Sequence, residues 1–123
     1  MSRTIISVVD DMFFAAKIRA TAESLGVILR SVRNLDLLIR AARESLPDLI
    51  IVDLHSQKID PLALAQALKS DQHLAEVRLL GFFSHVQVYL KQAALAAGYD
   101  VVIPRSVFSN DLAAILEGKL MRD

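Results

Sequence analysis

Short runs of consecutive hydrophobic residues recur along the chain, and between them the hydrophobic residues are spaced three or four positions apart. The most pronounced run covers residues 49–52, Leu-Ile-Ile-Val, and ends at Asp53. A run without polar alternation is typical of a strand buried on both faces, as in a parallel sheet covered by helices. The pattern predicts five strands, at residues 4–9, 27–29, 49–52, 77–83 and 101–103.

The segments between these runs have helical spacing. Gly26 and Gly98 are typical residues at a helix C-terminus, and Asp60-Pro61 is a cap followed by proline at the first helical position. Five strand–helix repeats predict an α/β fold with one parallel sheet between two layers of helices. The predicted helices span residues 12–25, 35–46, 61–70, 86–97 and 110–120, the last one capped by Ser109 or Asn110.

Length and composition narrow the class of protein. A chain of 123 residues, of which 54% are hydrophobic, predicts a single folded domain over residues 1–123 without an output domain. Lysine plus arginine and aspartate plus glutamate number 14 each, so the chain has no net charge that would favour binding to nucleic acid or to an anionic membrane. No apolar run approaches the ~20 residues that span a bilayer. The absence of cysteine excludes disulfides and thiolate sites, and is compatible with the cytoplasmic location that we expect.

Ionisable and hydroxyl side chains follow four of the predicted strands. Because the carboxyl ends of parallel strands meet at one edge, we expect these side chains to lie together. Carboxylates within ~4–6 Å repel by a few kcal/mol per pair, so the cluster needs a cation such as Mg²⁺. A metal ion there could direct a phosphoryl group to Asp53 as nucleophile. The residues at this edge are Asp10, Asp11, Asp53, Ser84, His85 and Arg105.

Several of these residues also have a purely structural interpretation. Asp10 and Asp11 are placed to cap the helix that starts at residue 12. Asp53 could form a salt bridge with Arg105 that has no chemical role. Ser84 could cap the next helix.

His85, at the edge, and the two phenylalanines at the start of the first helix also allow more than one interpretation. His85 is either the start of the fourth helix or a pocket residue beside the nucleophile, since histidine titrates near neutrality. Of the two aromatic residues at the start of the first helix, Phe14 is expected in the core. Phe13 is expected to be exposed near the mouth of the pocket, where it would suggest a partner surface.

Together these positions resemble the receiver domain of two-component response regulators. The resemblance covers nearly the whole chain and rests on Val8-Val9-Asp10-Asp11, Ile51-Val52-Asp53, a hydroxyl after the fourth strand and a basic residue after the fifth. It implies a flavodoxin-like (CheY-like) three-layer α/β/α fold with a five-stranded parallel sheet in the order 2-1-3-4-5. It also implies Asp53 as phosphoacceptor and Mg²⁺ ligand, Asp11 as direct Mg²⁺ ligand, Asp10 as ligand through water, the His55 carbonyl as a further ligand, and Ser84 as switch hydroxyl.

The chain departs from the receiver pattern at several positions. Receivers have a lysine after the fifth strand, followed by a proline in a cis peptide, whereas this chain has Pro104 and then Arg105. Arginine can bind a phosphate bidentately but is not interchangeable with lysine. His85 stands where a small residue is usual, and Val102 stands where an aromatic switch residue is usual. These departures resemble those of atypical receivers, or pseudo-receivers, in which phosphorylation is weak or lost.

Two functions are consistent with this pattern. The first is a stand-alone, non-enzymatic signalling module of a two-component or phosphorelay system. It would accept a phosphoryl group on Asp53 with Mg²⁺, from a histidine kinase or phosphotransfer protein, and bind a downstream protein. The second is a phosphorylation-independent pseudo-receiver, held in one state by Arg105 and Asp53, that serves as a protein-interaction module. In both, we expect partner binding through the fourth helix, fifth strand and fifth helix, and a monomer or a homodimer through that face.

Two other classes fit the residues less well. A phosphatase-like enzyme of the haloacid-dehalogenase pattern would need an acid two residues after the nucleophile Asp53, where His55 stands. A flavodoxin proper would need a Ser/Thr/Gly-rich loop after the first strand. The acidic pair Asp10-Asp11 in that turn would repel a flavin phosphate.

Overall fold

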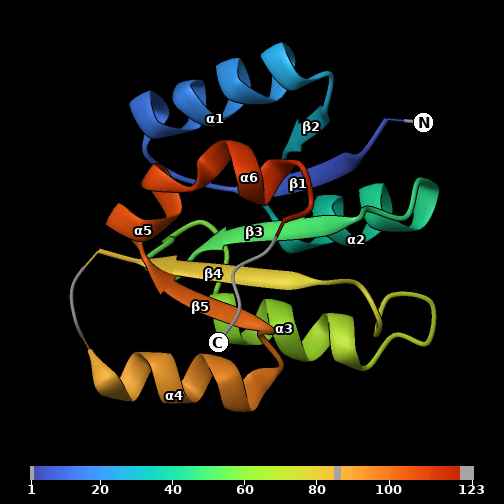
Figure 1. Ribbon diagram of the computed structural model, residues 1–123. Helices are drawn as coiled ribbons and strands as arrows, with labels where there is room; N and C mark the ends of the chain where they lie inside the picture. Colours follow the sequence, from blue (N-terminus) through green and yellow to red (C-terminus); the bar gives the residue numbers. More distant parts are fainter. Residues whose placement is uncertain (1, 85–86, 120–123) are drawn as a thin grey trace.

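Five parallel strands form the centre of the protein, seen here in a computed structural model that describes residues 2–84 and 87–119. Their order in the sheet is β2-β1-β3-β4-β5, and each neighbouring pair is parallel (Figure 1). The predicted α/β fold and strand order are confirmed. The strands are β1 (Thr4–Val8), β2 (Ile28–Ser31), β3 (Leu49–Asp53), β4 (Leu79–Phe83) and β5 (Val101–Pro104).

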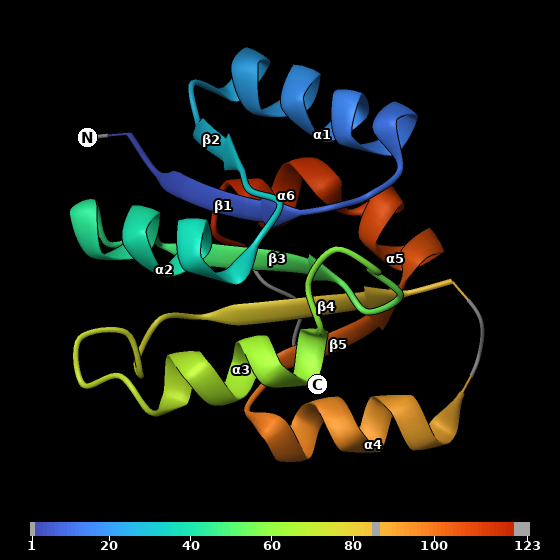
Figure 2. The ribbon, with the colours of Figure 1, turned by 180° about the vertical axis from the view of Figure 1, so that it is seen from behind.

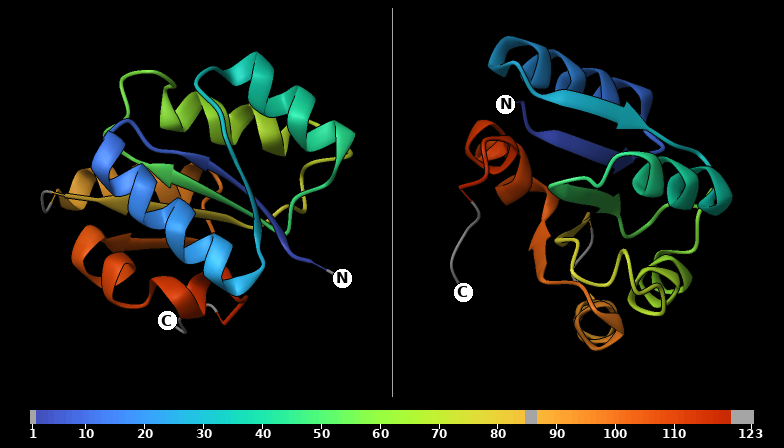
Figure 3. Two further views of the ribbon diagram at one scale, coloured as in Figure 1. Left: turned by 90° about the horizontal axis from the view of Figure 1, so that it is seen from above. Right: turned by 90° about the vertical axis from the view of Figure 1, so that its right-hand side faces the viewer.

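Helices cover both faces of this sheet. One face is covered by α1, α5 and α6, and Figure 2, seen from behind, shows α2, α3 and α4 on the other. The view from above in Figure 3 shows the strands between the two groups. No helix in the described ranges is long and apolar enough to cross a membrane. The helices are α1 (Met12–Leu25), α2 (Leu35–Glu44), α3 (Pro61–Lys69), α4 (Val88–Ala97), α5 (Arg105–Asn110) and α6 (Leu112–Leu116).

Successive residues of a strand point to opposite faces, so the central strand contributes to two cores. Ile50 and Val52 pack with α2, α3 and α4, while Leu49 and Ile51 pack with α1, α5 and α6. All five residues of β3 are buried, Asp53 included. The continuous apolar run is therefore a strand covered on both sides, as the sequence predicted.

The end of the chain differs from the prediction. The last helical segment was expected from residue 110, but helix starts at Arg105, directly after Pro104, with a break at Asp111 between α5 and α6. The reason is Phe108, which is buried and begins an apolar stripe at helical spacing that continues through Leu112 and Ile115. Arg105 is therefore the first residue of a helix and not part of a loop.

Smaller corrections concern the ends of other elements. The second strand extends to Ser31, because its register with β1 continues beyond Leu29. The second helix ends at Glu44, ahead of Leu46 and Pro47, and the fourth strand begins at Leu79. The predicted start of the fourth helix at residue 86 and the predicted end of the last helix at residue 120 lie outside the described residues.

Candidate functional site

The carboxyl ends of the strands bring several of the predicted residues to one edge of the sheet. Asp53 is the last residue of β3 and lies opposite Phe82 of β4. Asp10 and Asp11 connect β1 to α1, and Arg105 follows β5. The structure thus places these four charged residues at the edge where the arrowheads of β3, β4 and β5 end in Figure 1.

Asp53 is the most buried charged residue of this edge, with 8% of its surface exposed. Its Oδ1 accepts a hydrogen bond from the His55 backbone N–H at 2.9 Å. Burial raises the pKa of the Asp53 carboxyl above 3.8, and the negative charge of Asp10 raises it further. The His55 N–H and the charge of Arg105 oppose this rise without cancelling it. Ionising Asp53 therefore costs free energy in the folded protein.

Asp10 does not cap the first helix, as one interpretation of the sequence expected, because its carboxylate points to the loop after β3. Its Oδ1 accepts from the Ser56 hydroxyl at 2.8 Å, and its Oδ2 accepts from the Gln57 backbone N–H at 2.8 Å. Ser56 Oγ in turn accepts longer hydrogen bonds from the backbone N–H groups of Lys58 and Ile59. Both oxygens of Asp10 are therefore engaged in holding this loop.

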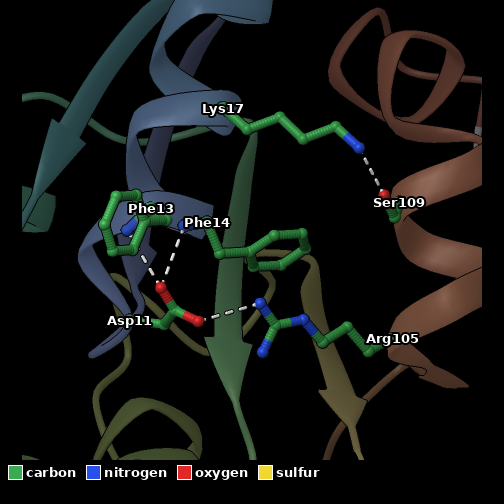
Figure 4. Close-up of polar contacts among 6 residues, drawn as sticks. All are labelled: Asp11, Phe13, Phe14, Lys17, Arg105 and Ser109. Atoms are coloured by element: carbon green, nitrogen blue, oxygen red, sulfur yellow. Dashed lines mark hydrogen bonds and ion pairs between the residues drawn. The ribbon is translucent and has the colours of Figure 1, made fainter.

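Asp11 is the N-cap of α1 and also the partner of Arg105 (Figure 4). Its Oδ1 accepts from the backbone N–H groups of Phe13 and Phe14 at 2.9 and 3.1 Å. Its Oδ2 accepts from Arg105 Nη2 at 3.1 Å. The Phe14 N–H and, next, the Arg105 guanidinium lower the pKa of Asp11 below 3.8. The ionised form of Asp11 is thus the one that the folded protein stabilises.

One interpretation of the sequence paired Arg105 with Asp53, but the ion pair of Arg105 in the structure is with Asp11. The guanidinium carbon lies 4.0 Å from the centre of the Phe14 ring, which favours this position through a cation–π contact. Phe14 packs edge-on against Phe82 and Phe108 at 5.4 and 5.8 Å between ring centres. A ring anchored in the core therefore holds the guanidinium beside Asp11.

Nearby, a contact between exposed side chains joins the helices that carry these residues. Lys17 Nζ of α1 donates to Ser109 Oγ of α5 at 2.6 Å (Figure 4). Together with the pair of Asp11 and Arg105, it links α1 to α5.

The two functions of Asp11 can be separated by substitution. Asparagine is also a good N-cap, so Asp11→Asn removes only the partly exposed ion pair and is expected to lower the free energy of unfolding slightly. Asp11→Ala removes the cap as well and is expected to lower the free energy of unfolding several times more. Urea unfolding at neutral pH compares the two variants. Equal losses for Asn and Ala would contradict the assignment of Asp11 as a cap.

For the other residues predicted at or near the site, the structure gives burial or exposure but no contact with the acidic residues. Ser84 follows β4 directly and its side chain is exposed, so its role as switch hydroxyl stays a prediction. His85 lies outside the described residues. Phe14 is buried as expected, and Phe13 is exposed over 91% of its surface. Val102 is buried in β5 and packs in the core, where it offers no aromatic ring.

The acidic residues are not arranged as a metal site. Within residues 2–84 and 87–119, no group of three histidine, cysteine, aspartate or glutamate side chains is placed to hold a metal ion. Their carboxylate oxygens are of the type that Mg²⁺ prefers. However, Asp10 points to its loop and Asp11 is bound to Arg105. The residues in this arrangement therefore do not fit a Mg²⁺ ion, and the predicted ligand role of the His55 carbonyl remains a prediction.

Sequence reasoning missed the residues that hold the acidic pair. Ser56 and Gln57 bind Asp10 across 46 and 47 positions of the chain, and the Phe14 ring supports Arg105. A hydroxyl three residues after Asp53 was a usable signal for Ser56, because serine readily bonds nearby polar groups in tight loops. Nothing local in the sequence indicates the other two contacts.

The comparisons with known proteins give a fold but no sequence match. No protein-family model matches the chain, and a search of curated proteins finds no match either. The structure is similar to the signal receiver domain of a signal transduction histidine kinase from Syntrophus aciditrophicus, with a TM-score of 0.80 and 24% identity over 94% of this chain and 88% of that one. The chemotaxis response regulator CheY4 of Vibrio cholerae aligns at a TM-score of 0.82 and 15% identity, over 98% of this chain and 100% of that one.

The fold is that of a receiver domain. A third structure with the receiver fold is the receiver domain of a sensor histidine kinase from Pseudomonas aeruginosa PAO1, described with a magnesium ion coordinated in its active-site cleft. It aligns at a TM-score of 0.80 and 19% identity, over 95% of this chain and 96% of that one. In this chain the corresponding edge of the receiver fold holds an internal ion pair between Asp11 and Arg105.

Proposed function

We propose that this chain is a receiver-like signalling module that acts by binding a partner protein and does not require phosphorylation of Asp53. The observation that supports the proposal is the ion pair of Arg105 with Asp11, in which a side chain of the protein itself serves as the counter-ion of one acid of the edge. This is the pseudo-receiver function, with one change. The arginine pairs with the N-cap aspartate and not with Asp53.

The chemistry of the edge supports the same proposal. Transfer of a phosphoryl group to a carboxylate brings together two negatively charged groups, and a metal ion normally offsets that repulsion. Asp10 and Asp11, the acids next to Asp53, are bound to the loop after β3 and to Arg105. Neither is therefore placed to hold a metal ion beside Asp53, and this lowers the rate of phosphoryl transfer.

The proposed partner is a protein, and the proposed docking face comprises α4, β5 and α5. On this face α4 exposes Val88, Tyr89 and Leu95. Large exposed apolar side chains of this kind are enriched at protein interfaces. The similar receiver domains from Syntrophus and Pseudomonas belong to histidine kinases, which makes a kinase or phosphotransfer protein a candidate partner. We propose a cytoplasmic module that is a monomer or a homodimer through the same face.

The phosphorylation state can be tested directly. The purified chain is incubated with acetyl phosphate and MgCl₂, and its intact mass is measured at once because acyl phosphates hydrolyse. We expect no gain in mass, in the wild type or in Asp53→Asn. A gain of one phosphoryl group that appears in the wild type and is absent from Asp53→Asn would overturn the proposal.

That outcome would establish the second candidate function, a phosphoacceptor module with Asp53 as acceptor, Mg²⁺ as cofactor and Ser84 as switch hydroxyl. It is favoured by the position of Asp53 at the carboxyl end of β3 in a receiver fold, and by the magnesium ion of the Pseudomonas domain. It would require Arg105 to release Asp11. In neither candidate does the chain act as an enzyme.

A further inference from the structure

We propose that the outer edge of β2 is a second docking site, which binds an extended acidic segment of a partner protein as a further strand of the sheet. This site is separate from the proposed docking face at α4, β5 and α5, because β2 and β5 form opposite margins of the sheet (Figure 3). The inference goes beyond the proposed function, since it involves neither Asp53 nor the acids beside it.

The two margins of the sheet differ in how well they are covered. The first two residues of β5 are buried, and β5 ends in Pro104. In β2, by contrast, Ile28, Arg30 and Ser31 are exposed, and only Leu29 is partly buried, on the side of α1. β2 also contains no proline, the residue that most directly blocks a strand edge. β2 is therefore the margin at which another strand can pair.

The hydrogen bonds between β1 and β2 show which backbone groups of β2 face outward. The N–H groups of Ile28 and Val32 donate to carbonyl groups of the neighbouring chain at β1, at 2.9 and 3.1 Å. Because successive residues of a strand turn their backbone groups to opposite sides, Leu29 and Ser31 direct theirs away from β1. In the part of the chain that the structure describes, no protein group bonds these outward groups. Both residues thus offer a donor and an acceptor to a further strand.

The charges along this edge favour an acidic segment. Residues 24–35 include Arg30 and Arg33 and no acidic residue. Glu44 of α2 lies 3.6 Å from Arg30, but 43% of the arginine side chain and 62% of the glutamate side chain are exposed. An exposed pair of this kind is weak, so Arg30 can turn to an acid on a paired strand. Opposite charges on paired strands stabilise the pairing.

The same arginines disfavour a second copy of this chain as the occupant. Pairing of two β2 edges would bring Arg30 and Arg33 of both copies to one short joint, where like charges repel. Charged side chains on an edge strand protect it against pairing with an identical edge. An acidic strand meets no such repulsion, so the arginines make the edge selective. Ile28, with 52% of its surface exposed, offers an apolar contact to aliphatic residues of that strand.

The test follows the backbone amides of the isotope-labelled chain by NMR during titration with a peptide of alternating valine and glutamate. A peptide of alternating valine and lysine is the matched probe. At saturating glutamate peptide, we expect the N–H groups of Leu29 and Ser31 to exchange with solvent more slowly. The N–H groups of Ile28 and Val32 already bond β1 and should keep their rates. The lysine peptide should bind several-fold more weakly.

Two pairs of variants separate the backbone from the charge. Ser31→Pro removes an outward N–H and keeps the bonds of Ile28 and Val32 to β1, so it should abolish binding, whereas Ser31→Ala should not change it. Arg30→Glu should reverse the preference between the two peptides. Arg78→Glu, at an exposed position ahead of β4, should leave the preference unchanged. If Ser31→Pro does not fold, the reversal by Arg30→Glu decides.

Three results would overturn the inference. Unchanged exchange at Leu29 and Ser31 with both peptides would exclude the edge as a docking site. Equal binding of the two peptides, or no effect of Arg30→Glu, would exclude an acidic partner. Self-association of the wild type that Ser31→Pro abolishes would identify a second copy as the occupant. A phosphoryl group on Asp53 would overturn the proposed function alone and leave this inference standing.

Discussion

Replacing Phe108 by alanine is expected to lower the free energy of unfolding by about 3–5 kcal/mol, the usual cost of removing a buried aromatic side chain. Phe108 is fully buried, with 0% of its surface exposed. Its ring stacks on Phe82 at 4.8 Å between centres and 10° between planes. Alanine is a good helix former, so the loss would come from packing and not from helix propensity. Urea unfolding followed by far-ultraviolet circular dichroism measures it.

Phe13→Ala is the matched control, because it makes the same chemical change at an exposed position. Phe13 lies next to Phe14 in the first turn of α1 but has 91% of its surface exposed. Its replacement is expected to change the free energy of unfolding by no more than about 0.5 kcal/mol. Comparable losses for Phe108→Ala and Phe13→Ala would show that the aromatic cluster is not packed as described.

The same cluster supports the candidate site. Phe14 contacts Phe108 on one side and the Arg105 guanidinium on the other. The position of the cation is thus set by core packing as well as by its ion pair with Asp11. This is why a change from lysine to arginine after the fifth strand is more than an exchange of charges: arginine can stack on a ring.

The fold could be predicted where the signals are local. Residues 49–52 form a buried strand because four consecutive aliphatic residues need cover on both faces. The helix Met12–Leu25 was predicted with its correct ends, since Asp11 caps its start and Gly26 adopts a positive φ of 72° at its end. The start of the last helical segment was wrong because no cap marks Pro104, and the need to bury Phe108 was overlooked.

The site could be predicted only in part. That Asp10, Asp11, Asp53 and Arg105 share an edge follows from strand order alone. Which of them bind each other does not, because it depends on side-chain rotamers across long separations: 94 positions for Arg105 with Asp11 and 46 for Ser56 with Asp10. Sequence reasoning therefore identified the charged residues of the edge and left the partner of the arginine open.

Asp53→Asn is expected to stabilise the protein at pH 7 by about 1–2 kcal/mol, since it removes the charge of a carboxylate whose burial is only partly offset by the His55 N–H. Asparagine keeps the shape of the side chain, and its Oδ1 can still accept from the His55 N–H, which bonds Asp53 Oδ1 at 2.9 Å. It also removes the repulsion between Asp53 and Asp10. The stabilising direction is unusual, because most single substitutions destabilise.

The gain should depend on pH in a defined direction. Burial raises the pKa of Asp53 in the folded chain above its unfolded value of 3.8. In the pH window between these two pKa values, the folded state holds a proton that the unfolded state has lost. The wild type therefore loses stability as pH rises through the window, and Asp53→Asn does not. The difference in unfolding free energy between the two proteins, measured by urea unfolding from pH 3 to pH 8, should be largest at neutral pH and vanish toward pH 3.

Glu23→Gln, at an exposed position of α1, is the control and should show no such difference from the wild type. An Asp53→Asn variant less stable than the wild type at pH 7 would mean that the ionised carboxylate is stabilised in the fold, and that Asp53 is better prepared for phosphoryl transfer than its burial indicates.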